Sequence, residues 1–419
     1  MNRHSHRRGL PPRVALVGLV GLLVLSGPSP AETGLLDLEG AGALALQQQP
    51  QLLAQEAAVV ALQESAPAAG QLPDPRLSFG LASLPLDSLR FTQEAMTQAV
   101  VGVTQAIPGG DKRRLAKARA EREAAQGRVA LAATSRRIVR DAQLAWLDVY
   151  YPNAAQALVK QVENDFLRQV EWSEVAYKTG KQSQEETLAQ RGMLEATRDR
   201  LADLRREEAK ARAGLARWVG RAAAWPLETL APPSPPPPLD QLVEQLEQHP
   251  ELALMNEAVS VAQADVDLAR EAYKPDWSVD LSYGLRGGDQ PDLVSVMVAV
   301  DLPLFTKNRQ DRRLAARLAE VAQMTQLRAD RHRALRAELE AAHAEWLAAD
   351  ARIERFERDI LPLAARRSES ALASYGSDRA SYARVLEARR AETEVRLQWL
   401  AQQVAGARAQ VLVRYFMAR

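Results

Sequence analysis

The stretch 277–285 reads WSVDLSYGL, and the stretch 294–302 reads VSVMVAVDL. In both stretches a large apolar side chain stands at every second position, with smaller, polar or acidic residues between most of them. Successive side chains of a β-strand point to opposite faces of its sheet. The alternation therefore predicts two strands, each with one apolar face and one face that contacts water.

An amphipathic helix of unusual length is predicted to follow these strands, over about 308–374. Apolar residues such as Leu318 and Trp346 recur at steps of three and four. A run of about 60 residues would extend roughly 90 Å, which suits a coiled-coil-like tube and not a globular core. We expect Pro362 to kink or interrupt the helix, and a break at Gly376 to turn the chain into a returning helix.

The first half of the chain repeats this order with a period close to 200 residues. Pro50-Gln51-Leu52 corresponds to Pro250-Glu251-Leu252, and Ile107-Pro108 corresponds to Leu302-Pro303. Trp146 likewise recurs as Trp346. Each half is predicted to begin with a short helix, at about 37–66 and at about 239–272, and Pro152 is expected to kink or interrupt the first long helix.

These correspondences divide the chain into two structural repeats and a proline-rich linker. The predicted segments are a first repeat over 32–231 (strands about 76–84 and 96–107, helices about 111–176 and 184–219), a linker over 232–238, and a second repeat over 239–419 (strands about 276–286 and 293–303, helices about 308–374 and 379–416).

Composition excludes several classes of function. The chain has 419 residues, a formal net charge of +1 and no cysteine. Disulfides, thiolate zinc sites, cysteine nucleophiles and a lipid on a cysteine are therefore excluded, and the near-neutral charge gives no support to nucleic-acid binding. No glycine-rich phosphate loop, HExxH or Gly-x-Ser-x-Gly motif occurs. We therefore expect no enzyme activity and no cofactor.

The N-terminal segment 1–31 is typical of a signal peptide. Four arginines and no acid precede an apolar run of about 12 residues, and small residues follow up to Ala31. A single transmembrane anchor is the weaker alternative, because so short a run does not span a bilayer. The rest of the chain has no run of 18 apolar residues, so we expect a periplasmic protein, a secreted protein or an outer-membrane β-barrel.

Four strands are too few to close a barrel, since eight is near the practical minimum. A barrel would therefore have to be shared between copies of the chain. Three copies would supply 12 strands and twelve helices.

Several short motifs carry a resemblance to a known family. They are PDPRL at 73–77, QAIPGGDKR at 105–113 and YKTG at 177–180. Together with the duplication, they resemble the TolC-type outer-membrane efflux channels over about 37–416. The Pro-Asp-Pro segment and the Gly-Gly-Asp-Lys-Arg junction look most like the CzcC/CusC-like subgroup, which serves heavy-metal exporters.

The resemblance implies an α+β membrane protein that forms a homotrimer. A 12-stranded β-barrel in the outer membrane would continue into a long periplasmic α-helical barrel. The protein would be the passive exit duct of a tripartite system, with a periplasmic adaptor (membrane-fusion) protein and an inner-membrane proton-driven transporter as partners. Heavy-metal cations are the expected substrate. A duct for multidrug or organic compounds, and a non-transporting periplasmic coiled-coil scaffold, remain as alternatives.

The same resemblance assigns candidate sites to the two hairpin tips. Contact with the adaptor is expected at Tyr177, Lys178, Thr179, Gly180 and Lys181, and at Tyr375, Gly376 and Ser377. Alternatively, the two glycines simply end helices in a left-handed turn.

The resemblance also implies a periplasmic gate, for which Asp378, Arg384 and Glu387 are the candidates. A ring of carboxylates would attract cations. Alternatively, Glu387 lies on a solvated helix face with Arg384 or Arg389 as its partner.

Two further pairs of residues have structural interpretations. Trp146 and Trp346 are expected to pack between helices. His332 and His343 would lie some 16 Å apart along one helix, which is too far for one metal ion. We therefore predict no metal site.

Overall fold

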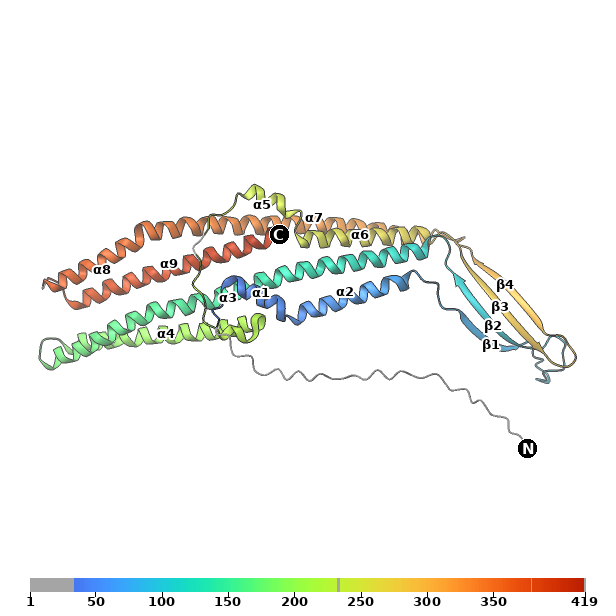
Figure 1. Cartoon of the computed structure of the whole chain (residues 1–419), viewed down its shortest axis with the longest axis horizontal. Helices are drawn as coiled ribbons and strands as arrows, with labels where there is room; N and C mark the ends of the chain where they lie inside the picture. Colours follow the sequence, from blue (N-terminus) through green and yellow to red (C-terminus); the bar gives the residue numbers. More distant parts are fainter. Residues whose placement is uncertain (1–33, 232–233, 378, 418–419) are drawn as a thin grey trace, which may run out of the picture.

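The computed structural model describes residues 34–231, 234–377 and 379–417. The predicted signal peptide and Asp378 lie outside these residues. The molecule is elongated, with a β-sheet at one end and two helical hairpins at the other (Figure 1). The described C-terminal residues lie near the middle of its length.

Four strands form one antiparallel sheet in the order β1-β2-β3-β4. Strands β1 and β2 come from the first repeat, and β3 and β4 come from the second. Pairing of β2 with β3 joins the two repeats, with Val101 opposite Tyr283. The strands are β1 (Arg76–Ala82), β2 (Gln98–Ile107), β3 (Asp276–Arg286) and β4 (Leu293–Asp301).

Each repeat contributes short helices and a long hairpin. The first repeat has α1 (Leu38–Gln48), α2 (Pro50–Ala69), α3 (Lys112–Lys178), α4 (Gln184–Val219) and the 3₁₀ turn η1 (Gly220–Ala224). The second has α5 (Leu239–Leu246), α6 (Pro250–Glu271), α7 (Gln310–Arg355), the π-helical turn η2 (Phe356–Ile360), α8 (Leu361–Gly376) and α9 (Tyr382–Phe416).

The helices form a single curved layer. On the side of the sheet, neighbouring contacts run α2–α3–α6–α7. On the side of the hairpin tips they run α4–α3–α9, and α9 packs against both α7 and α8. The long helices α3 and α7 therefore extend through both halves of the molecule (Figure 1).

Each predicted short helix is two helices, so that prediction was wrong. Gln49 and His249 adopt extended backbone conformations immediately before Pro50 and Pro250. Proline is tolerated at the first position of a helix but disfavours a helical conformation in the residue before it. The side chain of Gln49 donates to the carbonyls of Arg217 (2.9 Å) and Trp218 (3.1 Å), which fixes this break against the end of α4.

The two prolines inside the long helices behave differently. Helix α3 is continuous through Pro152, so the predicted interruption is absent there. Residues Val149 and Ala155 on either side are fully buried, and this packing holds the helix across the missing hydrogen bond. In the second repeat, the π-helical turn η2 precedes Pro362. Its wider turn relieves the clash that a proline ring makes with the carbonyl four residues earlier.

Both predicted tryptophan positions are confirmed as packing sites near the middle of the molecule. Trp146 is 1% exposed, lies among α1, α3, α4 and α9, and donates from Nε1 to the Leu36 carbonyl at 2.9 Å. Trp346 is 4% exposed and belongs to a second cluster with Leu335, Leu339 and Val413.

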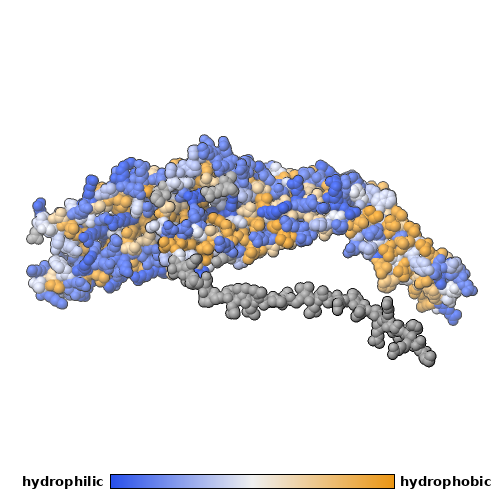
Figure 2. Space-filling model, in the orientation of Figure 1, coloured by the Kyte–Doolittle hydropathy of each residue, from blue (hydrophilic) through white to orange (hydrophobic). Residues whose placement is uncertain are grey.

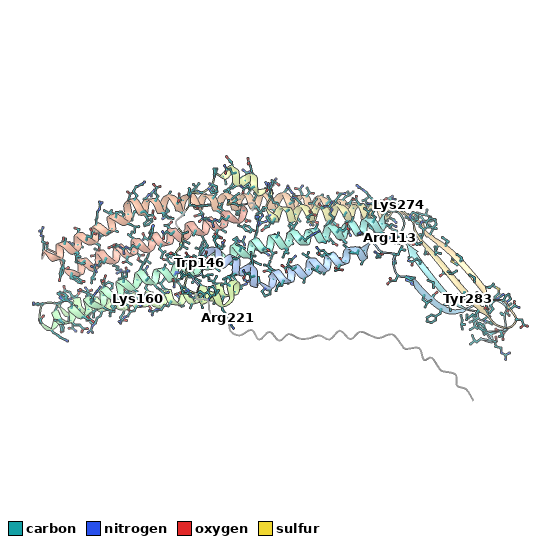
Figure 3. The ribbon with its side chains drawn as sticks, viewed as in Figure 1. Arg113, Trp146, Lys160, Arg221, Lys274 and Tyr283 are labelled. Atoms are coloured by element: carbon teal, nitrogen blue, oxygen red, sulfur yellow. The ribbon has the colours of Figure 1, made fainter. Side chains whose placement is uncertain are left out.

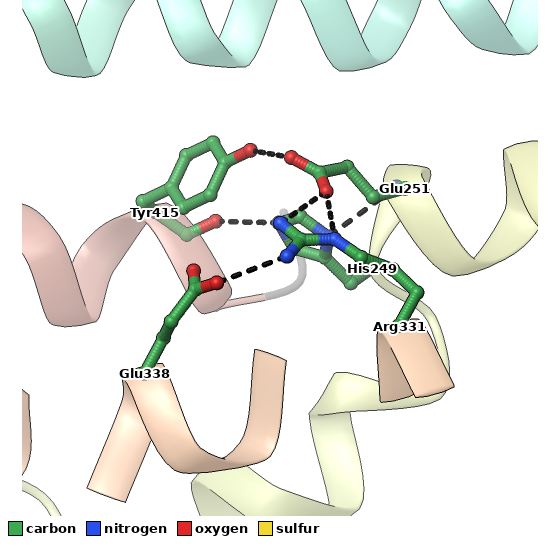
Figure 4. A network of polar contacts seen from close by, with 5 residues as sticks. All are labelled: His249, Glu251, Arg331, Glu338 and Tyr415. Atoms are coloured by element: carbon green, nitrogen blue, oxygen red, sulfur yellow. Dashed lines mark hydrogen bonds and ion pairs between the residues drawn. The ribbon is translucent and has the colours of Figure 1, made fainter. Parts of the chain in front are cut away.

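A buried polar network fixes the C-terminal end of α9 (Figure 4). The ring Nε2 of His249 contacts the Tyr415 carbonyl at 3.2 Å, and Glu251 accepts hydrogen bonds from the Tyr415 hydroxyl and from Arg331. Burial opposes ionisation of Glu251, but these donors hold its pKa below its ordinary value. Burial lowers the pKa of His249, so the imidazole is held neutral.

Candidate functional site

The sheet has two faces of opposite character. Because the register places Phe79, Val101, Tyr283 and Val294 opposite one another, they share one face. The next such row on that face is Leu77, Val103, Leu281 and Val296. All eight side chains are exposed, and Phe79 is 83% exposed. Apolar surface accordingly covers much of the visible part of the sheet in Figure 2.

The opposite face carries mostly small and polar side chains, with Met297 and Leu293 as exposed apolar exceptions. One row contains Ser78, Gly102, Ser282 and Ser295. In the next row the Thr104 hydroxyl donates to Asp280 at 2.7 Å. No described helix lies over either face (Figure 1). The sheet thus has one apolar face and one mostly polar face.

Both edges of the molecule are open in the single chain. Strands β1 and β4 each pair on one side only within the described residues. The helices beside them, α2 and α7, expose large apolar side chains along their length. These are Leu53 and Val60 on α2, and Leu318 and Leu327 on α7.

The first hairpin tip lies at the far end of the molecule from the sheet. In Figure 3, Lys160 marks the tip half of α3 and Tyr283 marks the sheet. Gly180 has a φ of 72°, and the Lys181 amide donates to the Ala176 carbonyl at 2.8 Å. Ser183 then caps α4 in a capping box with Glu186. The predicted tip residues Tyr177, Lys178, Thr179, Gly180 and Lys181 are exposed on this turn.

The second hairpin tip is built differently. Gly376 is the last residue of α8 and does not have a positive φ, so a left-handed turn at this glycine is wrong. The Ser377 amide donates to Ala373 at 3.2 Å, and the Arg379 amide donates to Ser374 at 2.9 Å. The tip still lies beside the first hairpin at the same end of the molecule (Figure 1).

The gate candidates Arg384 and Glu387 lie on the exposed face of α9. Their neighbours Val385, Leu386 and Ala388 are buried, and Leu386 packs against Phe166 and Leu194 of the first hairpin. Neither charged side chain makes an ion pair with a described residue, and the partner suggested for Glu387, Arg389, instead binds Asp165 at 3.1 Å.

Ion pairs and rings join the two hairpins near their tips. Besides the Arg389–Asp165 pair, Arg200 binds Glu394 at 2.9 Å. The ring of Tyr382 lies 6.4 Å from the ring of Trp172. These contacts could not be predicted from the sequence, because each joins helices that are far apart in the chain.

The two histidines considered as metal ligands have separate structural partners. His332 contacts Glu247 at 3.1 Å, and His343 contacts the Pro237 carbonyl at 2.9 Å. Among the described residues, no group of three or more histidine, aspartate or glutamate side chains is placed to hold a metal ion. Nor does any helix in the described ranges combine the length and apolar character needed to cross a bilayer.

Known proteins share this fold over almost the whole chain. CusC, studied for its folding and transmembrane channel formation, is 16% identical, with 91% of this chain and 92% of that chain covered and a TM-score of 0.74. VceC, an outer-membrane protein of Vibrio cholerae, is 18% identical, with coverages of 90% and 95% and a TM-score of 0.75. The CmeC outer-membrane channel of Campylobacter jejuni is 13% identical, with coverages of 90% and 85% and a TM-score of 0.76.

The chain has the fold of the outer-membrane channels. No protein family and no curated protein matches its sequence, so the likeness is one of structure. The MtrE channel of Neisseria gonorrhoeae, described in an open state, shares the fold with a TM-score of 0.72.

Proposed function

We propose that this chain is the outer-membrane exit duct of a tripartite export system. The observation that carries the proposal is the sheet, which exposes one continuous apolar face and one polar face. An apolar face of eight or more exposed large side chains is unstable in water. In a bilayer it would contact lipid, while the small and polar face would line an aqueous lumen.

The open edges support a ring of identical copies. The four strands alternate in direction, so β4 of one copy and β1 of the next would also pair antiparallel. Unpaired backbone groups inside a membrane are costly, and closure of the sheet removes them. Three copies would give the 12-stranded barrel that the TolC-type resemblance implies.

The helices beside the open strands carry matching side chains. Val60 and Leu53 lie nine and sixteen residues before the end of α2 that faces the sheet. Leu318 and Leu327 lie eight and seventeen residues after the corresponding end of α7. Because the helical rise is constant, these pairs would meet at the same heights when α7 of one copy packs against α2 of the next.

The hairpin tips would be the entrance of the duct. They stand at the end opposite the sheet, and so would face the periplasm. There they would contact an adaptor protein, while Arg384 and Glu387, with Asp378, would surround the entrance. The ion pairs between the hairpins, including Asp165–Arg389, would hold this entrance closed until a partner protein separates them.

The substrate proposed is a heavy-metal cation. Support comes from the sequence motifs that resemble the CzcC/CusC-like subgroup, PDPRL at 73–77 and QAIPGGDKR at 105–113. A duct for organic compounds would need the same fold. The inner-membrane transporter, and not the duct, would therefore determine whether metal cations or organic compounds are exported.

Membrane fractionation and a growth assay test the proposal. The protein should float with outer-membrane vesicles and form conducting pores in planar bilayers. Deletion of its gene should sensitise the host to zinc, cobalt, cadmium, copper or silver, with rescue by the intact gene. Sensitivity to dyes and antibiotics alone would contradict the metal substrate, and a protein extracted without detergent would favour the periplasmic scaffold.

A further inference from the structure

The segment between β4 and α7 exposes apolar side chains that the sheet does not explain. Residues 302–309, the β4–α7 junction, include Leu302, Leu304 and Phe305, which are 64%, 72% and 80% exposed. Backbone hydrogen bonds shape the segment, from the Leu304 amide to Leu302 at 2.9 Å and from the Arg309 amide to Thr306 at 3.0 Å. These side chains are therefore displayed by an ordered turn.

The junction continues the apolar face of the sheet. Leu302 follows Val296, Val298 and Val300 in the alternation of β4, so it lies on the same side. It stands one residue beyond the last paired position, Asp301. The apolar surface thus extends past the sheet toward the helices.

Four cations come next along the chain. Lys307, Arg309, Arg312 and Arg313 are all exposed, and no acidic side chain in the described part of the chain pairs with them. Asp311, which lies among them, accepts a hydrogen bond from Tyr273 at 2.6 Å. By contrast, Arg317 one turn further on is bound to Glu320 at 2.6 Å.

Within the described residues, the corresponding junction of the first repeat has no unpaired run of cations, and its apolar side chain at the position of Leu302, Ile107, is only 38% exposed. There Gly109 follows Ile107-Pro108, and a side-chain carbon at Gly109 would meet the Pro275 carbonyl oxygen at 1.7 Å. Lys112 binds Asp276 at 2.7 Å and the Lys274 carbonyl at 2.8 Å. In the single chain the β4–α7 junction lacks such contacts with the described residues. In the proposed ring, the α2–β1 segment of the next copy would lie beside it, as residues 274–276 lie beside the junction of the first repeat.

We propose that the β4–α7 junction is a binding site for anionic phospholipid at the periplasmic surface of the outer membrane. The inference rests on the proposed outer-membrane location. Along the chain, apolar side chains at the end of the lipid-facing strand come first and cations follow. In a membrane leaflet the acyl chains and the phosphates are arranged in the same order, so the apolar side chains would contact acyl chains and the cations would contact phosphate. Charge complementarity commits it to a lipid with net negative charge, such as phosphatidylglycerol. Because the chain has no cysteine to carry a lipid, such a site would add to the hold of the barrel on the membrane.

Native mass spectrometry of the detergent-purified full chain tests the site. The protein is titrated with phosphatidylglycerol or, separately, with phosphatidylcholine. Wild type should retain the anionic lipid preferentially. Since each cation near an anionic surface contributes about a fivefold preference, the double variant Lys307→Gln/Arg309→Gln should lose roughly twenty- to thirtyfold of its phosphatidylglycerol affinity.

Two further variants make the test specific. Lys160→Gln/Arg205→Gln removes one lysine and one arginine that are exposed on the tip half of the helices, and should bind as wild type does. Phe305→Ser should weaken both lipids, because it removes the inserted ring and no charge.

Three results would overturn the site. The first is equal retention of the two lipids by wild type. The second is unchanged phosphatidylglycerol binding by Lys307→Gln/Arg309→Gln. The third is dissociation of the ring by that variant while lipid binding stays constant, which would assign the cations to a contact between copies. A wild-type protein that fails to reach the outer membrane would instead contradict the proposed function.

Discussion

Replacing Leu318 by aspartate is expected to break the proposed ring of copies apart. Leu318 is 47% exposed on α7, and Val60 is 55% exposed on α2. Burial of a whole leucine or valine side chain contributes about 1.5–3 kcal/mol, so covering the exposed half of each should contribute about 1 kcal/mol per side chain, or about 2 kcal/mol per contact. An aspartate here forfeits that gain and adds several kcal/mol for a desolvated, unpaired carboxylate. Every contact between copies carries the change, so the cost is repeated around the ring.

The pair of positions allows a sharper test than the single change. Val60→Lys alone should also dissociate the ring. Combined in one chain, Val60→Lys and Leu318→Asp place opposite charges at each contact, because α2 of one copy meets α7 of the next. We therefore expect the double variant to recover much of the assembly.

Light scattering of the detergent-solubilised particle measures the outcome. Gln263→Asp is the matched control, since it adds the same charge at an exposed position of α6, which is an interior helix of the layer. A ring that survives Leu318→Asp, or a double variant that assembles no better than either single one, would refute the proposed contact.

Three other perturbations test separate parts of the structure. Gly180→Ala should destabilise the first hairpin by about 1–2 kcal/mol because its φ is 72°, whereas Gly376→Ala should be nearly neutral; thermal melting of both variants compares them. Burial lowers the pKa of His249 from its ordinary value of 6.5. The neutral imidazole therefore stabilises the fold fully above about pH 6.5, and this stabilisation is lost as the pH falls further. Between about pH 7.5 and about pH 5.5, the melting temperature of His249→Gln should fall less than that of wild type. Asp165→Asn breaks the pair with Arg389, worth about 1 kcal/mol, and should raise the open fraction in single-channel recordings about fivefold; an unchanged open fraction would rule out a latch.

The sequence predicted secondary structure best where the two faces of an element differ in polarity. The alternation over 294–302 predicts a strand because apolar side chains stand at every second position, and β4 covers Leu293–Asp301. The breaks before Pro50 and Pro250 were missed because the apolar stripe continues across both. The π-helical turn at Phe356–Ile360 has no periodic signature of its own.

Contacts between helices that are far apart in the chain could not be predicted from the sequence. Asp165 and Arg389 are 224 residues apart, and each has several opposite charges nearby along its own helix. Only the packing of α9 against α3 selects this pair. The tip of the second hairpin shows the same limit, since Gly376 corresponds loosely to Gly180 in sequence but adopts a helical conformation.

The duplication itself specifies how two copies should meet. Within one chain β2 of the first repeat pairs with β3 of the second. In the duplication β4 corresponds to β2, and β1 corresponds to β3, so β4 of one copy is expected to pair with β1 of the next in the same way. Ile107-Pro108 corresponds to Leu302-Pro303, which equates Val101 with Val296. Leu77 to Gly80 corresponds to Leu281 to Gly284, which equates Tyr283 with Phe79.

The pairing of Val101 with Tyr283 then predicts that Val296 of one copy lies opposite Phe79 of the next. The hairpin registers give a competing prediction, because Phe79 lies opposite Val101 and Tyr283 lies opposite Val294, which equates Val101 with Val294 and places Val294 opposite Phe79. The chain has no cysteine, so Val296→Cys/Phe79→Cys should form a disulfide between copies on oxidation, seen as linked chains on a denaturing gel. Directly opposite side chains have Cβ atoms about 4.5–5.5 Å apart, whereas diagonal neighbours lie about 7–8 Å apart, beyond the reach of a disulfide. Val294→Cys/Phe79→Cys, displaced by two residues on the same face, should then remain unlinked. Efficient linkage of Val294→Cys/Phe79→Cys alone would show that the contact between copies follows the register of the hairpins and not the correspondence of Ile107-Pro108 with Leu302-Pro303.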